Sequence, residues 1–226
     1  MNLTLATDDT GGPEIFASLQ GEGPNMGRPV AFVRLSRCNL ACTWCDTAYT
    51  WRFTGDNRPH RDGIAFERKA NQVVLSPGEV AGQISALEQT RLVITGGEPL
   101  LQAGALAEML AHLPDMSVEI ETNGTVAPPP RLERLVDQYN VSPKLSHSGI
   151  VSTVPCIHQP NSFSSFLRSS NLFRSLLIKY WVFRRCSPNN LSNRRFSSAS
   201  TDDSAQGTFS YYRIYWIYHW GYYWIY

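Results

Sequence analysis

Short apolar segments alternate with amphipathic ones between residues 14 and 149, and this alternation limits the folds that the chain can adopt. Strands that are joined by helices pair in parallel, in an open α/β sheet or a barrel. We therefore predict an α/β fold that forms a partial (β/α) barrel. The expected strands are 29–35, 91–95, 117–122 and 139–143, and the expected helices are 77–89 and 99–113.

The first expected helix carries a complete start signal. Ser76 is a suitable N-cap, Pro77 suits the first helical position, and Glu79 stands three residues after the cap, where it can complete a capping box. We therefore expect this helix to begin at Pro77 and to end near Gln89.

Composition excludes several classes of protein. A chain of 226 residues can bury a core without the help of disulfides. A net charge of +1 and a hydrophobic content of 42% are typical neither of a nucleic-acid-binding protein nor of a disordered one. The first residues lack the basic start and apolar run of a signal peptide, and the aromatic segment at 211–226 is too short for a membrane span. We expect a cytoplasmic protein that binds neither nucleic acid nor membrane.

Three of the five cysteines lie in one stretch, CNLACTWC at 38–45, directly after the expected strand 29–35. In a reducing compartment, clustered cysteines are more often metal ligands or redox groups than disulfide partners. A structural zinc site takes four ligands, and the nearest further candidate, His60, falls in a polar segment that we expect to be mobile. Three thiolates suit a 4Fe–4S cluster in which one iron keeps an open position. A chance group of buried thiols is the alternative.

The C-x3-C-x2-C spacing of Cys38, Cys42 and Cys45 resembles the cluster motif of the radical S-adenosylmethionine enzymes, and Trp44 fills their aromatic position before the last cysteine. TGGEP at 95–99 similarly resembles their GGEP motif. The resemblance implies a barrel of that type, in which the open iron binds S-adenosylmethionine and the cofactor yields a 5′-deoxyadenosyl radical. No side chain is then expected to be the catalytic group itself. The glycines of GGEP would let the backbone approach the methionyl amino group, which Glu98 would help to hold.

Four longer segments resemble the family of 7-carboxy-7-deazaguanine synthases. They are 14–47, LVITGGEPLLQ at 92–102, VEIETNGT at 118–125 and NVSPKLSHSG at 140–149. The resemblance implies a lyase that converts 6-carboxy-5,6,7,8-tetrahydropterin into 7-carboxy-7-deazaguanine with loss of ammonia, in the biosynthesis of queuosine and other deazapurines. It also implies Mg²⁺ as a further cofactor, a flavodoxin or ferredoxin as electron donor, and a homodimer.

The same resemblance assigns roles to individual residues. It implies that the metal ligands are Cys38, Cys42 and Cys45 for the cluster and Thr47 for Mg²⁺. S-adenosylmethionine would contact Trp44, Cys45, Asp46, Gly97, Glu98, Ser142, Pro143 and Lys144. The substrate would contact Leu19, Gln20, Gly21, Arg34 and Thr95, with Glu121 as a further pocket residue. Arg34, a cation within an apolar strand, would pair with the substrate carboxylate.

The sequence changes character after Gly149. Residues 151–226 contain 14 serines, eight Lys or Arg and two acids, and they end in YYRIYWIYHWGYYWIY. Neither the strand–helix alternation nor the family's later segments can be recognised there. We therefore divide the chain into a partial barrel, 1–150, and a divergent, poorly folded tail, 151–226, such as a frameshift would produce. An incomplete barrel predicts impaired activity, and Cys156 and Cys186 are expected to be free thiols without a role.

Two other functions stay open at this point. A glycyl-radical-enzyme activating enzyme shares C-x3-C-x2-C but acts on a protein. A non-catalytic metal-binding or interaction protein could use the aromatic tail for association. The substrate-pocket residues at 19–21 and Arg34 speak against the first of these.

Overall fold

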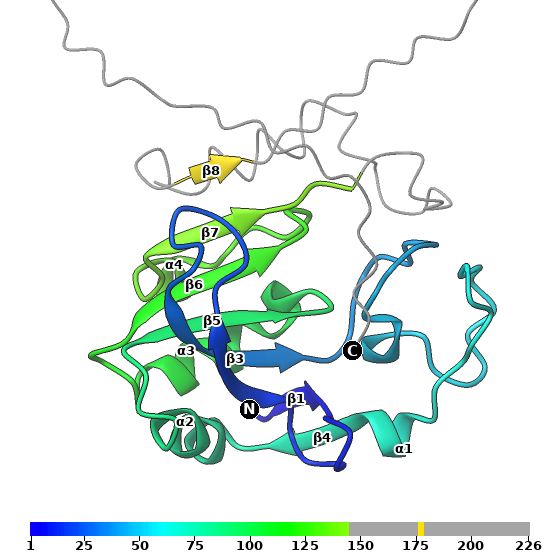
Figure 1. Cartoon of the computed structure of the whole chain (residues 1–226), viewed down its shortest axis with the longest axis horizontal. Coiled ribbons are helices and arrows are strands. Elements are labelled where there is room, and N and C mark those ends of the chain that lie inside the picture. The colour runs from blue at the N-terminus through cyan, green and yellow to red at the C-terminus, as the bar shows by residue number, and fades with distance from the viewer. Residues whose placement is uncertain (145–175, 179–226) are drawn as a thin grey trace, which may run out of the picture. The chain divides into compact units, whose positions relative to one another are not determined.

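The computed structural model describes residues 1–144 and 176–178. Their strands form one sheet in the order β4-β1-β3-β5-β6-β7-β8, and β2 pairs with β3 outside this order (Figure 1). The strands are β1 (Leu3–Ala6), β2 (Ile15–Leu19), β3 (Pro29–Leu35), β4 (Gln72–Leu75), β5 (Arg91–Gly96), β6 (Ser117–Thr122), β7 (Gln138–Val141) and β8 (Leu176–Ile178).

The sheet has a parallel part and an antiparallel part. Strands β3, β5, β6, β7 and β8 pair in parallel, as the strand–helix alternation predicted. Strands β1 and β2 pair with β3 in the antiparallel sense, and β4 pairs with β1 in the same way. The antiparallel strands were not predicted. The α/β fold with the parallel strands of a partial barrel is confirmed.

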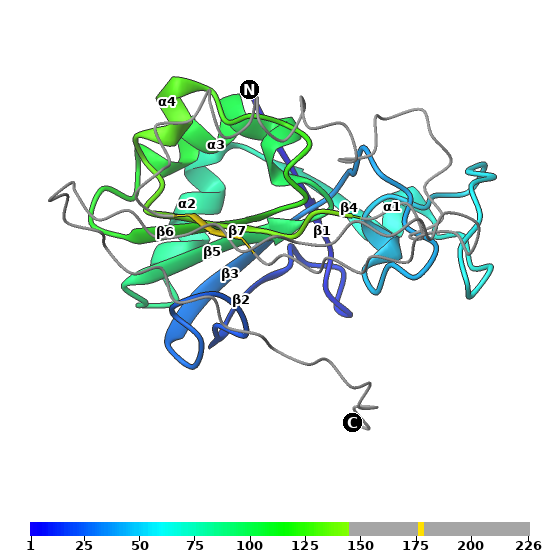
Figure 2. The same ribbon diagram turned by 90° about the horizontal axis from the view of Figure 1, so that it is seen from above.

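The helices α2 (Pro77–Ser85), α3 (Ala103–Leu110) and α4 (Pro130–Glu133) cover one face of the sheet, whereas β2 and the loop that follows it lie over the other (Figure 2). We call this second face the open face. The remaining helices are the short α1 (Arg68–Asn71) and the two 3₁₀ helices η1 (Ala48–Thr50) and η2 (Pro99–Gln102).

Alternate residues of the parallel strands pack against the helices. Those on β3 and β5 meet Val80 and Ile84 of α2 and Leu106 and Met109 of α3 in one buried apolar cluster. The members from the parallel strands are Ala31, Val33, Leu35, Leu92, Ile94, Val118, Ile120, Tyr139 and Val141, and Leu3 and Leu5 of β1 join them. Because side chains alternate along a strand, the residues between them point to the open face.

Helix α2 begins as its sequence predicts. The Ser76 side chain accepts a hydrogen bond from the backbone N–H of Glu79, and the Glu79 carboxylate accepts one from the backbone N–H of Ser76. The helix ends at Ser85, four residues before the expected Gln89, and Glu88 then adopts a positive φ of 54°. The expected helix 99–113 begins as the 3₁₀ helix η2 and continues as α3.

Ser76→Ala should lower the free energy of unfolding by about 1 kcal/mol, because the variant loses one side of the capping box. Ser85→Ala, an exposed change at the other end of α2, should shift it by less than about 0.5 kcal/mol. Urea unfolding followed by circular dichroism compares the two variants. Equal effects would contradict a specific role for the cap.

One strand lies in the tail, 151–226, where no strand–helix alternation was recognised in the sequence. Strand β8 pairs in parallel with β7, with Tyr139 opposite Leu176 and Val141 opposite Ile178. The parallel order therefore extends past β7, beyond the strands that were recognised in the sequence. The proposed boundary at 150/151, Cys156 and Cys186 lie outside the described residues. Among the described residues, no helix has the length and apolar character needed to cross a membrane.

Candidate functional site

Four loops meet at one edge of the sheet because parallel strands all end there. The loop after β3 carries the three cysteines, and the loop after β5 carries Gly97 and Glu98. Strands β6 and β7 end at Thr122 and at Val141, just before Ser142-Pro143-Lys144. The predicted cofactor-binding segments therefore converge, although they are far apart in the sequence.

The cysteine loop, which we define as residues 37–47, is fastened to the sheet at its start. The backbone N–H of Glu98 donates to the carbonyl of Arg37 at 2.9 Å, and the N–H of Arg37 donates to the carbonyl of Thr50 at 2.7 Å. Asn39 donates to the Thr125 hydroxyl at 2.7 Å and accepts from the Asn123 amide at 3.0 Å. The loops after β5 and β6 thus set the position of the first cysteine.

The three thiols are free and interact with one another electrostatically. Burial, with small additions from Glu98 and from the other two cysteines, raises the pKa of Cys38 to about 12. Burial also raises the pKa of Cys42, although the nearby Lys144 opposes the shift. The Leu40 N–H donates to the Cys38 sulfur at 3.4 Å. Among the described residues, no three His, Cys, Asp or Glu side chains are arranged to hold one metal ion.

Gly96 and Gly97 lie directly against the end of β3. A Cβ atom at Gly96, where φ is +137°, would be 2.1 Å from the carbonyl oxygen of Leu35. A Cβ atom at Gly97 would be 2.0 Å from the carbonyl oxygen of Arg37 and 3.0 Å from the Cβ of Cys38. Contact with the cysteine loop is therefore itself a reason for two glycines here, beside the predicted approach to a cofactor.

Glu98 is fully buried, and both of its carboxylate oxygens accept hydrogen bonds. Its Oε1 accepts from the Thr122 hydroxyl at 2.8 Å and from the Leu100 N–H at 3.1 Å, and its Oε2 accepts from the Asn123 N–H at 2.8 Å. Burial raises the pKa of this carboxyl. The structure therefore shows Glu98 joining the ends of β5 and β6, whereas its predicted contact with a methionyl amino group stays a prediction.

The other predicted cofactor residues lie around Lys144. The Lys144 ammonium donates to the Ser142 hydroxyl at 2.9 Å and lies 5.7 Å from the centre of the Trp44 ring. Its charge also acts on Cys42 and Glu98. Trp44 is 43% exposed, so part of the indole is available for contact. Lys144 thus brings the loop after β7 to the cysteine loop.

A row of polar side chains crosses the open face near the C-terminal ends of the strands. Arg34 on β3 is level with Thr95 on β5, and the Thr95 hydroxyl donates to Glu121 on β6 at 2.8 Å. Glu121 is in turn level with Asn140 on β7. We call these four residues the polar row. Two of the predicted substrate residues, Arg34 and Thr95, therefore lie side by side with the further candidate Glu121.

Arg34 is held by a residue that the sequence analysis did not identify. Its Nε donates to Glu14 Oε1 at 2.6 Å, and the Tyr49 hydroxyl donates to Glu14 Oε2 at 2.9 Å. The ion pair is mostly buried, with 20% of the Arg34 side chain and 14% of the Glu14 side chain exposed. Glu14 therefore fixes the guanidinium through Nε, and no hydrogen bond within the described residues engages its Nη groups, which stay available to a ligand.

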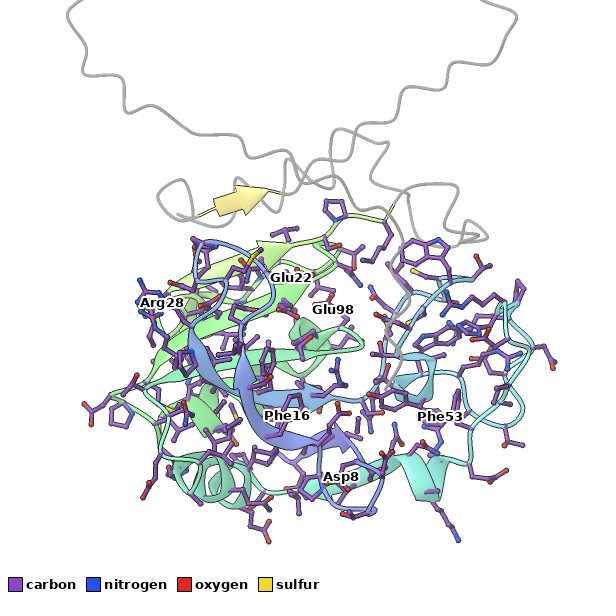
Figure 3. All side chains as sticks on the ribbon, viewed as in Figure 1. Asp8, Phe16, Glu22, Arg28, Phe53 and Glu98 are labelled. Carbon is purple, nitrogen blue, oxygen red and sulfur yellow. The ribbon has the colours of Figure 1, made fainter. Side chains whose placement is uncertain are left out.

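The loop between β2 and β3 folds over the open face. The Gln20 amide, which is 1% exposed, donates to Glu119 at 3.1 Å, and the Asn25 amide donates to Glu119 at 2.7 Å. A Cβ atom at Gly23 would lie 2.4 Å from the Asn140 amide oxygen, so the loop rests on β7. Figure 3 shows Glu22 on this loop. The predicted Gln20 thus turns towards Glu119.

Two further predicted residues, one at the end of β2 and one in this loop, are exposed. Leu19 is 59% exposed, and Gly21 has no neighbouring atom within 4 Å of where its Cβ would be. A separate hollow of about 600 Å³ holds none of the predicted site residues, and its lining comprises Thr7, Asp8, Asp9, Glu14, Phe16, Tyr49, Phe66, Ala70 and Asn71.

The carboxyl of Glu121 has a raised pKa, chiefly because it is buried and secondly because Glu22 is near. A raised pKa in the folded state contributes stability that is fully present below the ordinary value of 4.5 and is lost as the pH rises through the folded-state pKa. As the pH rises from 4.5 through the folded-state pKa, the free energy of unfolding of Glu121→Gln should therefore increase relative to that of the wild type. Urea unfolding at a series of pH values measures this.

Thr95 can still donate to the amide oxygen of that glutamine, so the variant changes mainly the charge. Glu88→Gln, at an exposed turn after α2, is the matched control. A difference between wild type and Glu121→Gln that is the same at every pH would contradict the expectation.

The residues that sequence reasoning missed are buried or structural partners of the predicted ones. They are Glu14, Tyr49, Glu119, Asn123 and Asn140. A signal existed for Glu119, because the charged Glu119 and Glu121 alternate with apolar residues in the expected strand 117–122. The contact between Glu14 and Arg34 depends on the antiparallel pairing of β2, and no local pattern reveals it.

The Radical SAM superfamily profile matches residues 33–165, which include the cysteine loop and the ends of β3, β5, β6 and β7. The chain belongs to the radical S-adenosylmethionine superfamily. It is similar to proteins named 7-carboxy-7-deazaguanine synthase. That of Pyrobaculum aerophilum is 45% identical over 61% of this chain and 56% of its own length. That of Neisseria meningitidis is 35% identical over 60% of this chain and 53% of its own length.

The chain is also similar to a solved structure. The crystal structure of QueE from Escherichia coli is 28% identical and has a TM-score of 0.50, over 76% of this chain and 68% of that one. The chain spans about half the length of the curated relatives it matches. These comparisons confirm the resemblance, and they do not favour a glycyl-radical activating enzyme or a non-catalytic protein.

The residues present fit the cofactors that this superfamily uses, a 4Fe–4S cluster and S-adenosylmethionine. The cysteine loop offers three free thiols at one strand end, and these would hold a 4Fe–4S cluster with one iron left open to S-adenosylmethionine. Beside them, Lys144 supplies a positive charge and Trp44 an exposed aromatic face. When bound, the cluster and S-adenosylmethionine supply an adenosyl radical.

Proposed function

We propose that the chain is a 7-carboxy-7-deazaguanine synthase. It would convert 6-carboxy-5,6,7,8-tetrahydropterin into 7-carboxy-7-deazaguanine with loss of ammonia, as a lyase of deazapurine and queuosine biosynthesis. The observation that carries the proposal is the polar row, which sets a cation, Arg34, and a carboxylate, Glu121, beside the cysteine loop. The identity with the synthases of Pyrobaculum and Neisseria supports it.

The two charged residues of the polar row, Arg34 and Glu121, match the two ends of the substrate. Arg34, with its Nε engaged by Glu14, presents its remaining N–H groups to the pterin carboxylate. The Glu121 carboxylate accepts the N–H groups of the pterin's amino edge, and Thr95 keeps that carboxylate in place. Gln20 acts indirectly, because its amide binds Glu119 and so holds the loop that carries Leu19, Gly21 and Glu22 over the pocket.

The remaining cofactor contacts belong to the same proposal. Cys38, Cys42 and Cys45 bind the cluster, and Gly97, Lys144 and their neighbours surround S-adenosylmethionine. Thr47 lies two residues after Cys45, with its hydroxyl 3.6 Å from the Cys45 sulfur, and is the proposed Mg²⁺ contact. We further propose a cytoplasmic homodimer that receives its electron from a flavodoxin or ferredoxin.

Anaerobic reconstitution of the full chain tests the function. We expect uptake of about four irons per chain, reductive cleavage of S-adenosylmethionine, and formation of 7-carboxy-7-deazaguanine from the tetrahydropterin. A variant with Cys38, Cys42 and Cys45 changed to alanine should show none of the three. Cleavage of S-adenosylmethionine without the deazaguanine product would reject the substrate, and absence of iron uptake would reject the cluster.

A further inference from the structure

The segment 52–66, which includes the polar stretch 55–63 around His60 that we expected to be mobile, is a folded loop with its own contacts. At its base, the Phe66 N–H donates to the Arg52 carbonyl at 3.0 Å and the Thr54 N–H donates to the Phe66 carbonyl at 2.9 Å. Inside it, the Arg52 side chain donates to the carbonyls of Arg58 and Ile64. Close ends and internal packing are the features of a compact Ω-loop. Phe53 marks its base in Figure 3.

The tip of this loop binds the cysteine loop at two points. The backbone N–H of Arg61 donates to the carbonyl of Thr43 at 2.7 Å. The ring of His60 hydrogen-bonds the carbonyl of Cys45 through Nε2 at 2.8 Å. Thr43 lies between the second and the third cysteine, and Cys45 is the third cysteine. The tip therefore fixes the half of the cysteine loop that the sheet does not hold.

The surroundings of His60 make it a donor to that carbonyl. Its Nδ1 accepts from the backbone N–H of Asp62 at 3.4 Å, so Nε2 carries a proton. Only 3% of the side chain is exposed, and the Trp51 ring packs edge-on against the imidazole, with the two ring centres 6.3 Å apart. A buried imidazole with both nitrogens engaged has one orientation, and in this orientation it holds the Cys45 carbonyl.

The cysteine loop is thus held from two sides. Contacts from Glu98, Asn123 and Thr125 hold its start, as described above. His60 and Arg61 hold its end. Between them, the Cys45 N–H donates to the Cys42 carbonyl at 3.2 Å. Removal of the second attachment would leave Cys45 tied to the fold mainly through the chain itself.

We propose that the loop 52–66 is a brace for the iron–sulfur cluster, with His60 as the positioning residue that keeps Cys45 in place to ligate it. This role rests on the proposed cluster ligation by the three cysteines and adds a residue outside the motif. His60 acts through the backbone of Cys45, so it is neither a fourth ligand nor a catalytic group. Its loss should weaken retention of the cluster rather than prevent its assembly.

Iron release tests the brace without an assay of turnover. The reconstituted full chain is exposed anaerobically to a colorimetric iron chelator, and the EPR spectrum of the dithionite-reduced cluster is recorded. His60→Ala should release iron about tenfold faster than the wild type, as loss of an outer partner of a ligand commonly does, and should broaden the EPR signal. His60→Gln, whose amide can donate to the same carbonyl, should recover most of the difference.

His112→Ala is the matched control, because His112 is exposed and lies after α3. Circular dichroism of each apoprotein checks that the variants fold. Equal iron release from His60→Ala and the wild type overturns the brace while leaving the proposed function intact. Failure of His60→Gln to recover also overturns it, since the donor would then not be what matters. A wild-type chain that binds no cluster overturns the proposed function itself.

Discussion

Gly97→Ala should lower the free energy of unfolding by about 3 kcal/mol and greatly reduce the iron content after reconstitution. The added methyl group would be placed 2.0 Å from the carbonyl oxygen of Arg37 and 3.0 Å from the Cβ of Cys38. Both neighbours belong to a backbone that the sheet holds, so neither can give way cheaply. The variant must therefore displace the cysteine loop or the loop after β5. Urea unfolding and iron analysis measure the two effects.

Gly82→Ala is the matched control for this change. Gly82 lies on α2, and no atom is within 4 Å of the position that its Cβ would take. Alanine should there raise the free energy of unfolding by up to about 1 kcal/mol, because it is the better helix former. Wild-type stability and iron content in Gly97→Ala would show that the cysteine loop is not packed as described.

Arg34→Ala should lower kcat/KM for the tetrahydropterin by about two orders of magnitude, the cost of removing one partner from a buried charge pair. Arg34→Lys should recover little, because an ammonium cannot keep the Glu14 contact and also bind a carboxylate with two parallel hydrogen bonds. Steady-state kinetics after reconstitution measures both variants. The control is Arg28→Ala, because the Arg28 side chain is exposed at the start of β3 (Figure 3).

A pterin without the 6-carboxylate tests the assigned role more sharply. The wild type should bind this analogue more weakly than the carboxylated substrate, and Arg34→Ala should bind the two almost equally. An undiminished preference for the carboxylate in Arg34→Ala would assign its recognition to another residue.

The elements with strong local patterns were predictable. The strands 29–35 and 117–122 are as expected, because each is a continuous or alternating apolar run with clear ends. The short strands β1, β2 and β4 were missed because their pairing is antiparallel and depends on partners far along the chain, such as Leu5 with Val73. Helix α2 ends four residues before the expected end, and the chain turns at Glu88, where φ is positive, before it enters β5.

The candidate site was predictable where chemistry depends on a local motif. The cysteine spacing and TGGEP identified the superfamily, and the parallel strands bring both motifs to one edge. The partners that fix the motif residues were not predictable. Glu14 approaches Arg34 only through β2, and His60 reaches Cys45 only because the segment between them folds back. Such contacts are properties of tertiary packing, which residue spacing does not encode.

The spacing within the polar row also restricts the length of a ligand that can contact both of its charged residues. Arg34 and Glu121 belong to strands that are two places apart in the sheet, so their backbones are separated by about 10 Å. Their charges are opposite, so in the proposed function a ligand that reaches from Arg34 to Glu121 meets a cation at one end and a carboxylate at the other. A dianion of the right length is repelled at Glu121, and a shorter monoanion reaches only Arg34. In the proposed function, the sheet would thus select a ligand by its length and by the charge at each of its ends before any chemistry begins.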